Sequence, residues 1–308
     1  MVLIFSKNDD YSTSSVIKWF IKDKIKFLRL NENDEILIKQ LTSNNFIFEY
    51  NGTEYLLDDV ISVWYRRGDV LIKNFDNNIE YLKEENNAIK NYIHFLLNQK
   101  KHINTFFNAD FNKLELINFK GFSLIKIPKS ILTQKKNEAV LFFSSVNKKA
   151  ISKPISIPFS IINEKGTYMS YTSKINEEDI NNLPNDFVPT LFQEQIEKKF
   201  EIRTFVLDNK TYSMCIFSQN NNQTKIDFRV YDDEKPNRIS PFKLPTEIEN
   251  DIFRILNHYG IDCASIDLIY TSKKEFYILD INPIGQFGMV SLPCNYNLEK
   301  NISNYLSI

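Results

Sequence analysis

The sequence predicts an α/β (α+β) protein, and three observations lead to that prediction. The first 30 residues run from a short apolar segment through a stretch with helical spacing to a second apolar segment, which is typical of a βαβ unit. Two later stretches alternate in polarity on both sides of a polar turn, which predicts antiparallel hairpins. With 308 residues, 43% of them hydrophobic, the chain is long enough for two or three packed units.

Composition excludes several classes of protein. The 38 Lys+Arg residues balance 39 Asp+Glu, so no overall positive charge favours nucleic acid or an anionic membrane as partner. The start turns polar after five residues, unlike a signal peptide, and no apolar run approaches the ~20 residues of a membrane span. Three cysteines without CxxC spacing indicate neither disulfides nor zinc. Seven glycines and no GxGxxG disfavour a dinucleotide-binding fold. We therefore expect a cytoplasmic protein.

The first unit is predicted to span residues 1–123. VLIF, SVIKWFIKD and KFLRL form its opening strand, helix and strand, and a hairpin follows that turns at Asn51-Gly52. ISVWYRRGDV contains a further strand. Apolar spacing over residues 80–98 predicts a long helix, and NADFNKLELINFKG predicts a second one, with Asn108 or Asp110 as its cap and Gly121 at its end.

Two further units are predicted at residues 124–190 and 191–308. The first of them contains short strands in IKIPKSILT, AISKPISI and TYMSYTSKI, with a helix in EAVLFFSS. The second begins with the strand LFQEQI. It has one hairpin turning at Asp208-Asn209 and another at Ser272-Lys273, with an amphipathic helix from Thr246 to Gly260 between them.

The last hairpin carries oxygen-bearing side chains on one face. A turn at Ser272-Lys273 places Asp267 opposite Ile278, so that Asp280 is its diagonal neighbour and Asn282 continues the same face. Carboxylate and amide oxygens are hard ligands suited to Mg²⁺. A solvated strand face explains the pattern about equally well, but the strand around Asp280 is apolar, where an unpaired carboxylate is costly. The hairpin therefore predicts a magnesium site.

Further charged residues, of both signs, occur near this hairpin in the predicted sheet. Arg203 lies two residues from Glu201 on the neighbouring hairpin, so the two share a face, and Glu194 lies on the preceding strand. An arginine beside a metal and a phosphate can neutralise charge on a transferring phosphoryl group. Lys113 and Lys153 stand in a helix and an apolar strand, although a single lysine is more often a surface residue.

An ordered set of motifs resembles a known family. SVWYRRG, NADFNKLEL, GFSLIKIPKSILT, ISKPIS, PTLFQEQIEKKFEIRTFV, IDFR and ILDINPIGQFG follow one another as in the ATP-grasp ligases that build graspetides, the microviridin-type ribosomal peptides. The resemblance is greatest to the grasp-with-spasm subgroup. It implies a three-part ATP-grasp fold: a pre-ATP-grasp domain at 1–123, a small central subdomain at 124–190, and a C-terminal subdomain at 191–308 that holds ATP and Mg²⁺.

The resemblance also implies residue roles. The residues implied to bind the nucleotide are Lys113 and Lys153 at the phosphates, Glu194 at the adenine, Glu201 at the ribose and Arg203 at the reacting phosphate. The residues implied to bind Mg²⁺ are Asp267, Asp280 and Asn282. Arg203 and Lys153 are thereby catalytic candidates. Those for the peptide are Asp227 and Arg229 in IDFR, together with Arg66 and Arg67. For this arginine pair, a strand end held by acidic partners is an equal alternative.

The implied activity is ligation on a ribosomal precursor peptide with a leader and a core. An Asp or Glu carboxylate is phosphorylated by ATP, and a Ser/Thr hydroxyl or Lys amine then closes an ω-ester or ω-amide ring. The alternatives are a ligase of the same fold that adds a free amino acid, and an inactive peptide-binding module. The segment after Lys153 has one glycine instead of a glycine-rich flap, and resembles the hairpin that holds the leader. For the assembly of the chain, a homodimer is one candidate.

Overall fold

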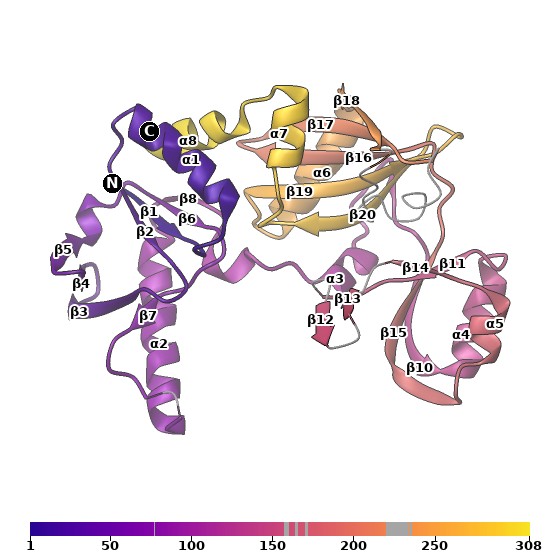
Figure 1. Ribbon diagram of the computed structural model, residues 1–308, viewed down its shortest axis with the longest axis horizontal. Coiled ribbons are helices and arrows are strands. Elements are labelled where there is room, and N and C mark those ends of the chain that lie inside the picture. Colours follow the sequence, from indigo (N-terminus) through magenta and orange to yellow (C-terminus); the bar gives the residue numbers. More distant parts are fainter. Residues whose placement is uncertain (77, 157–159, 164–165, 170–171, 220–233, 235) are drawn as a thin grey trace.

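The computed structural model describes the 308-residue chain except for residues 77, 157–159, 164–165, 170–171, 220–233 and 235 (Figure 1). Figure 1 shows an N-terminal region beside the C-terminal sheet, and a central region below that sheet. Within the described residues, no helix is long and apolar enough to cross a membrane.

The N-terminal region is built on a four-stranded parallel sheet. Its order is β2-β1-β6-β8, with strands Phe27–Leu30, Val2–Phe5, Ser62–Tyr65 and Lys101–Ile103. Helix α1 (Tyr11–Lys22) joins β1 to β2, which confirms the predicted βαβ unit. Asp10 caps α1 because its side chain accepts a hydrogen bond from the Thr13 N–H.

Helices cover both faces of this sheet. Alternate residues of β1 and β6 pack into two cores: one contains α1 and the C-terminal helix α8 (Leu298–Ser307), and the other contains α2 (Glu80–Leu97), the predicted long helix. The second core also buries a smaller sheet of order β5-β4-β3-β7, with strands Thr53–Leu56, Phe46–Tyr50, Glu35–Leu41 and Leu71–Ile72. Its β4–β5 hairpin turns at Asn51-Gly52 as predicted, both with positive φ.

Helix α3 (Lys113–Asn118) follows the N-terminal region and precedes the strands of the other two regions. It begins later than predicted: its cap is Asn112, whose side chain accepts from the Leu114 N–H, and neither Asn108 nor Asp110. The three candidate N-cap residues are all Asn or Asp, so the residue type alone does not show which of them caps the helix. The helix ends before Gly121, since Phe119 already has extended dihedrals.

The central region is an antiparallel sheet of order β10-β15-β11-β14, packed on α4 (Lys136–Ser145) and α5 (Glu177–Asn181). Its strands are Ser130–Lys135, Asp186–Glu194, Ala150–Ser152 and Ser173–Ile175. Strands β12 (Ser160–Asn163) and β13 (Gly166–Met169) form a separate hairpin in the segment after Lys153.

The C-terminal region is a six-stranded sheet of order β18-β17-β16-β19-β20-β9. Its strands are Arg238–Phe242, Lys210–Phe217, Phe200–Leu207, Cys263–Tyr270, Phe276–Asn282 and Ile125–Lys126. The predicted turn at Asp208-Asn209 is confirmed, with positive φ at both residues. Helix α6 (Thr246–His258) covers one face and α7 (Gly288–Cys294) contacts the other.

Strand pairing departs from the predicted unit boundaries at two places. Strand β9 lies within residues 124–190 but pairs with β20 of the C-terminal sheet. Strand β15 extends to Glu194, past residue 191, and belongs wholly to the central sheet. In addition, α8 packs on the N-terminal sheet, so the last residues of the chain return to its first unit.

Candidate functional site

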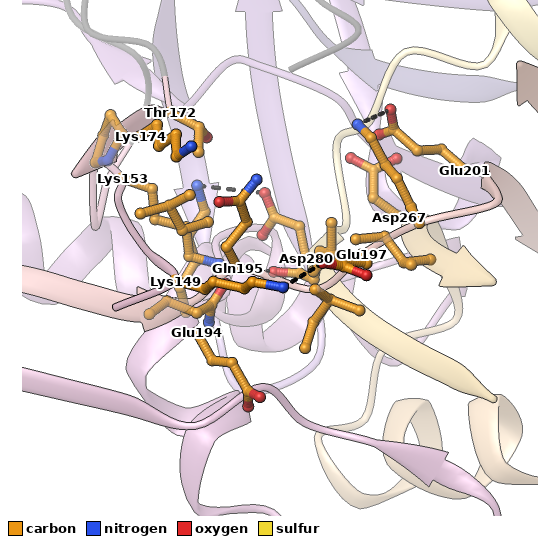
Figure 2. A pocket seen from close by; sticks show the side chains of 18 of the residues that line it. Lys149, Lys153, Thr172, Lys174, Glu194, Gln195, Glu197, Glu201, Asp267 and Asp280 are labelled. Atoms are coloured by element: carbon orange, nitrogen blue, oxygen red, sulfur yellow. Dashed lines mark hydrogen bonds and ion pairs between the residues drawn. The ribbon is translucent and has the colours of Figure 1, made fainter. Parts of the chain in front are cut away.

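The candidate site is a cavity of about 560 Å³ between the central and C-terminal sheets (Figure 2). Elements far apart in sequence line it: α3 contributes Lys113, and the segment from β11 contributes Lys153. Strand β19 contributes Asp267, and β20 contributes Asp280. Such a cleft between two sheets is a common place for a ligand to bind.

A row of charged residues crosses three strands at the cavity. Arg203 on β16 is the direct partner of Asp267 on β19, and Asp267 is the direct partner of Asp280 on β20. The prediction that Asp267 opposes Ile278 is therefore wrong. The β19–β20 loop is one residue longer than predicted, so Ile278 pairs with Leu268, and an extra residue then follows in β20.

That extra residue is Leu279, and it forms a β-bulge. Pairing passes from Leu268–Ile278 to Asp267–Asp280, which leaves Leu279 outside the regular ladder. Leu279 and Asp280 both line the cavity. The carbonyl of Leu279 accepts a hydrogen bond from Lys153 Nζ at 3.0 Å. Bulges free backbone groups in this way, and they are frequent beside active sites.

The face of β16 on the side of the cavity has an apolar half and a polar half. Phe205 and Leu207 lie in the core that includes α7, whereas Glu201 and Arg203 occupy the same face nearer the cavity. Because alternate strand residues share a face, one strand both anchors itself in a core and presents charge to a ligand. The alternating sequence FEIRTFVL thus predicts the placement of Arg203.

Arg203 is held tightly, with only 7% of its surface exposed. Its Nη1 lies 3.0 and 3.3 Å from the two carboxylate oxygens of Asp267, and its Nη2 donates to the Gln286 carbonyl at 3.5 Å. These contacts on two sides orient the planar guanidinium. Arg203 does not itself line the cavity, but its partner Asp267 does.

Asp280 is the carboxylate best suited to a metal. Burial raises its pKa, Lys113 and Lys153 oppose that shift, and the charge of Asp267 adds to it. Lys113 Nζ lies 3.2 Å from Oδ2, whereas Oδ1 is buried and accepts no hydrogen bond from any described residue. A buried carboxylate oxygen without a donor is costly unless a cation binds there. The residues therefore fit Mg²⁺.

The other predicted ligands differ in position. Asn282 follows Asp280 by two residues on the same face of β20, but it is exposed and does not line the cavity. Among the described residues, no three His, Cys, Asp or Glu side chains form a metal-binding group. The candidate metal ligands that line the cavity are therefore the two carboxylates of Asp267 and Asp280. Two carboxylates suit a metal ion whose other ligands are water and phosphate oxygens.

The two predicted nucleotide carboxylates both line the cavity. Glu194 ends β15, and its Oε2 accepts from the Lys129 N–H at 3.3 Å; Figure 2 shows its carboxylate turned away from those of Glu201, Asp267 and Asp280. Glu201 is buried, which raises its pKa although the ammonium of Lys198 opposes the shift. Lys198 forms an ion pair with Glu201.

The candidate peptide residues are less closely grouped. Arg66 is buried and Arg67 partly exposed; their Nε atoms lie 3.2 and 3.4 Å from the same Asp10 oxygen. Neither lines the cavity. Asp10 is the acidic partner that the alternative interpretation of Arg66 and Arg67 anticipated. Asp227 and Arg229 lie outside the described residues, so their predicted role stays a prediction.

Sequence reasoning missed several residues of the cavity wall. Lys149, Lys174, Gln195 and Glu197 line it (Figure 2), and so does Lys198. The spacing of Lys198 three residues before Glu201 was an available signal for an ion pair. Lys149 and Lys174 carried no such signal, because strand pairing across the central sheet decides their positions.

Comparisons with known proteins show what the fold resembles. No protein-family model matches the chain, and no match is found among curated proteins. Among solved structures, the macrocyclase MdnC from Microcystis aeruginosa MRC, bound with precursor peptide MdnA, is 24% identical with a TM-score of 0.78; the match covers 99% of both chains.

Two further solved structures match over nearly the whole chain. The RiPP-associated ATP-grasp ligase of Chryseobacterium gregarium, in complex with ADP and a leader and core peptide, is 23% identical with a TM-score of 0.77, over 99% of this chain and 95% of that one. The ATP-grasp ligase PsnB, complexed with a minimal-precursor variant, Mg and ADP, is 14% identical with a TM-score of 0.71, over 99% and 97%.

The fold predicted from the sequence motifs is thereby confirmed. The chain matches the ATP-grasp fold of these ligases over 99% of its length. At this level of identity the likeness establishes the fold, and the chemistry has to be argued from the residues in the cavity.

Proposed function

We propose that this chain, which has the ATP-grasp fold, is an ATP-dependent peptide ligase that closes rings in a ribosomal precursor peptide. It would phosphorylate Asp or Glu side chains of the peptide and join them to Ser/Thr hydroxyls or Lys amines. The solved structures that resemble it include ligases with ADP, Mg and precursor peptides bound, which supports this substrate class.

One observation carries the proposal: Asp267 and Asp280 meet Lys113 and Lys153 at one cavity, and Arg203 is paired with Asp267. Positive groups from two other elements thus flank a pair of carboxylates. A triphosphate with its metal requires this combination, because the lysines and arginine offset phosphate charge while the carboxylates hold the cation. The volume of about 560 Å³ is in the range of small-molecule sites.

The reaction proceeds in two displacements. A peptide carboxylate oxygen attacks the γ-phosphorus of ATP, the bond to the β-phosphate oxygen breaks, and ADP leaves with that electron pair. A hydroxyl or amine of the same peptide then attacks the acyl carbon, loses its proton, and expels phosphate. Because both groups belong to one bound peptide, positioning supplies much of the rate acceleration.

The residues of the chain have separate parts in this reaction. Arg203, which is paired with the cavity residue Asp267, would stabilise the charge that develops on the phosphoryl group. Lys153 and Lys113 bind phosphate oxygens, exchanging their present contacts with the Leu279 carbonyl and Asp280. Asp267 and Asp280 would hold Mg²⁺, with Asn282 two residues further along β20 as a third candidate ligand, and the ion would neutralise phosphate charge.

Mass spectrometry tests the proposal. Candidate precursor peptides encoded near the gene are incubated with the enzyme, ATP and Mg²⁺, with Arg203→Lys as the control of reduced but measurable activity. Ring closure lowers the peptide mass by one water per ring. A peptide that gains the mass of an amino acid less water would instead show the free-amino-acid ligase, and an unchanged mass with every candidate peptide would count against both.

A further inference from the structure

Residues 283–287 join β20 to α7, and the backbone carbonyls of the first four, residues 283–286, accept hydrogen bonds from side chains. Asn104 Nδ2 donates to the Pro283 carbonyl at 3.0 Å. Arg66 Nη1 donates to the next two carbonyls, of Ile284 and Gly285, the latter at 3.2 Å. The fourth carbonyl, of Gln286, accepts from Ser265 Oγ at 3.3 Å and from Arg203 Nη2 at 3.5 Å.

The donors come from two regions of the molecule. Asn104 and Arg66 belong to the N-terminal region, whereas Ser265 and Arg203 belong to the C-terminal sheet. The N-terminal region makes one more contact, from Ser12 Oγ to the side-chain Oε1 of Gln286 at 2.9 Å. This segment therefore links the N-terminal region to the arginine at the cavity.

Arg66 is firmly placed within this link. It is 3% exposed, and its Nε lies 3.2 Å from Asp10, the residue that caps α1. Its guanidinium also lies over the ring of Phe287, 5.6 Å from the centroid. Burial lowers the pKa of Arg66 to about 10, against the opposing charge of Asp10, so the side chain stays protonated at neutral pH.

Gly285 shows how closely the segment approaches the sheet. A Cβ at this position would lie 2.3 Å from Ser265 Cβ and 2.9 Å from the Asn282 carbonyl oxygen. Only glycine permits that approach. The Gln286 carbonyl is consequently fixed against β19, and a carbonyl fixed in this way can orient the guanidinium that donates to it.

We infer that Arg66 is a positioning residue for Arg203. By holding the carbonyls of Ile284 and Gly285, it fixes the Gln286 carbonyl, and this carbonyl, together with Asp267, sets the plane of the Arg203 guanidinium. The inference rests on the proposed function, in which Arg203 acts at the reacting phosphate. It also gives the buried arginine of VWYRRG a role that needs no contact with the peptide.

A double-mutant cycle on ring formation tests the inference. Arg66→Lys keeps the charge but lacks the planar fork, and we expect it to lower kcat about tenfold or more with the KM for ATP within about twofold. In an Arg203→Lys background, the same change should lower kcat less than about twofold, because its effect acts through Arg203. Equal effects in both backgrounds would overturn the inference.

Two further measurements separate positioning from loss of folding. Arg29 also makes side-chain bonds within the N-terminal region, to Ser6 and Ser14; Arg29→Lys is therefore the matched control and should leave kcat unchanged. Hydrogen exchange of the peptide spanning residues 282–288 should be faster in Arg66→Lys than in Arg29→Lys. Equal exchange in the two variants would overturn the link.

Failure of the proposed function gives a different result. If the unmodified enzyme forms no ring with any precursor, ligation is refuted, while hydrogen exchange of residues 282–288 needs no peptide and still reports on the link. If ligation occurs but Arg66→Lys and Arg203→Lys lower kcat independently, the function stands and the positioning role falls.

Discussion

Asp280 combines a raised pKa with an oxygen that accepts no hydrogen bond from the described residues. Asp280→Asn preserves the size of the side chain but removes the charge that would bind Mg²⁺. We expect ring formation to fall at least about 100-fold. Leader affinity, measured by fluorescence anisotropy with a labelled leader peptide, should stay within about twofold, because the proposed role of Asp280 is to bind Mg²⁺ beside the nucleotide.

The control for this substitution lies in the same hairpin. Glu275 sits in the β19–β20 loop and forms an ion pair with Lys126 outside the cavity. Glu275→Gln should leave both ring formation and leader affinity unchanged. A parallel loss of leader affinity in Asp280→Asn would show that Asp280 has a structural role instead of binding the metal.

Asp251 determines the path of the chain between α3 and β9. Its carboxylate is fully buried and accepts from the N–H groups of Ser123, Leu124 and Ile125, and Arg254 lies 2.7 Å away. Burial alone would raise its pKa, but these donors together lower it. A lowered folded-state pKa contributes stability above the unfolded value, and this stability is lost as pH falls through the folded-state pKa.

Asp251→Asn replaces an acceptor with a group that also donates. At pH 7 we expect it to lower the free energy of unfolding by about 2–4 kcal/mol, since buried N–H donors lose a charged acceptor. The difference from the unmodified protein should begin to shrink below about pH 4, the pKa of an Asp in the unfolded chain, and should disappear once the pH falls below the lowered folded-state pKa of Asp251. Urea unfolding of both proteins at pH 7 and below pH 4 measures the difference in the free energy of unfolding. Glu247→Gln, exposed on the same helix, should cost less than about 1 kcal/mol.

At the scale of the element, α3 shows how a short helix serves the site. It spans only six residues and begins with Lys113, the residue that reaches Asp280. A helix this short has little stability of its own. Its cap, Asn112, therefore bears directly on where the ammonium of Lys113 lies.

Asn112→Ala removes that cap. The substitution should cost the helix about 1 kcal/mol and lower the affinity for ADP with Mg²⁺ by up to about fivefold, with little change in Tm. Isothermal titration calorimetry measures the affinity. Asn176→Ala removes the corresponding cap of α5, which lies outside the cavity, and should leave the affinity unchanged. Equal losses in both variants would contradict the role of α3.

At the scale of the whole molecule, α8 joins the two ends of the chain. Leu298, Ile302 and Leu306 are buried in a core shared by α1, β1 and β16. The Ser62 hydroxyl of β6 donates to the Leu306 carbonyl at 2.6 Å. The N-terminal and C-terminal regions therefore share one core, and their stabilities should be coupled.

Ile302→Ala tests this coupling. Removal of the buried side chain should lower the free energy of unfolding by about 2–5 kcal/mol. Amide exchange should also become faster in β1 and β6, although neither strand is changed. Asn304→Ala on the exposed face of α8 is the control and should change neither. Faster exchange confined to α8 would show that the two regions unfold separately.

Much of the fold could be predicted, because its signals are local. Asn51-Gly52 and Asp208-Asn209 adopt positive φ in two-residue turns, and such turns depend on few neighbours. The pairing of Asp267 with Asp280 could not be predicted correctly, since one additional loop residue and the bulge at Leu279 shift the register. Residue periodicity cannot detect a bulge that keeps both flanking segments alternating.

The sequence by itself determined the elements with clear periodicity and, through motifs that resemble a known family, the ATP-grasp fold and several of the charged residues at the cavity, because these follow from ordered motifs and local spacing. Only the tertiary structure decided the register of Asp280, the return of α8 to the first sheet, and the contact of Arg66 with Ile284 and Gly285. Each of these depends on groups far apart in the chain, and packing, which no local pattern encodes, brings them together.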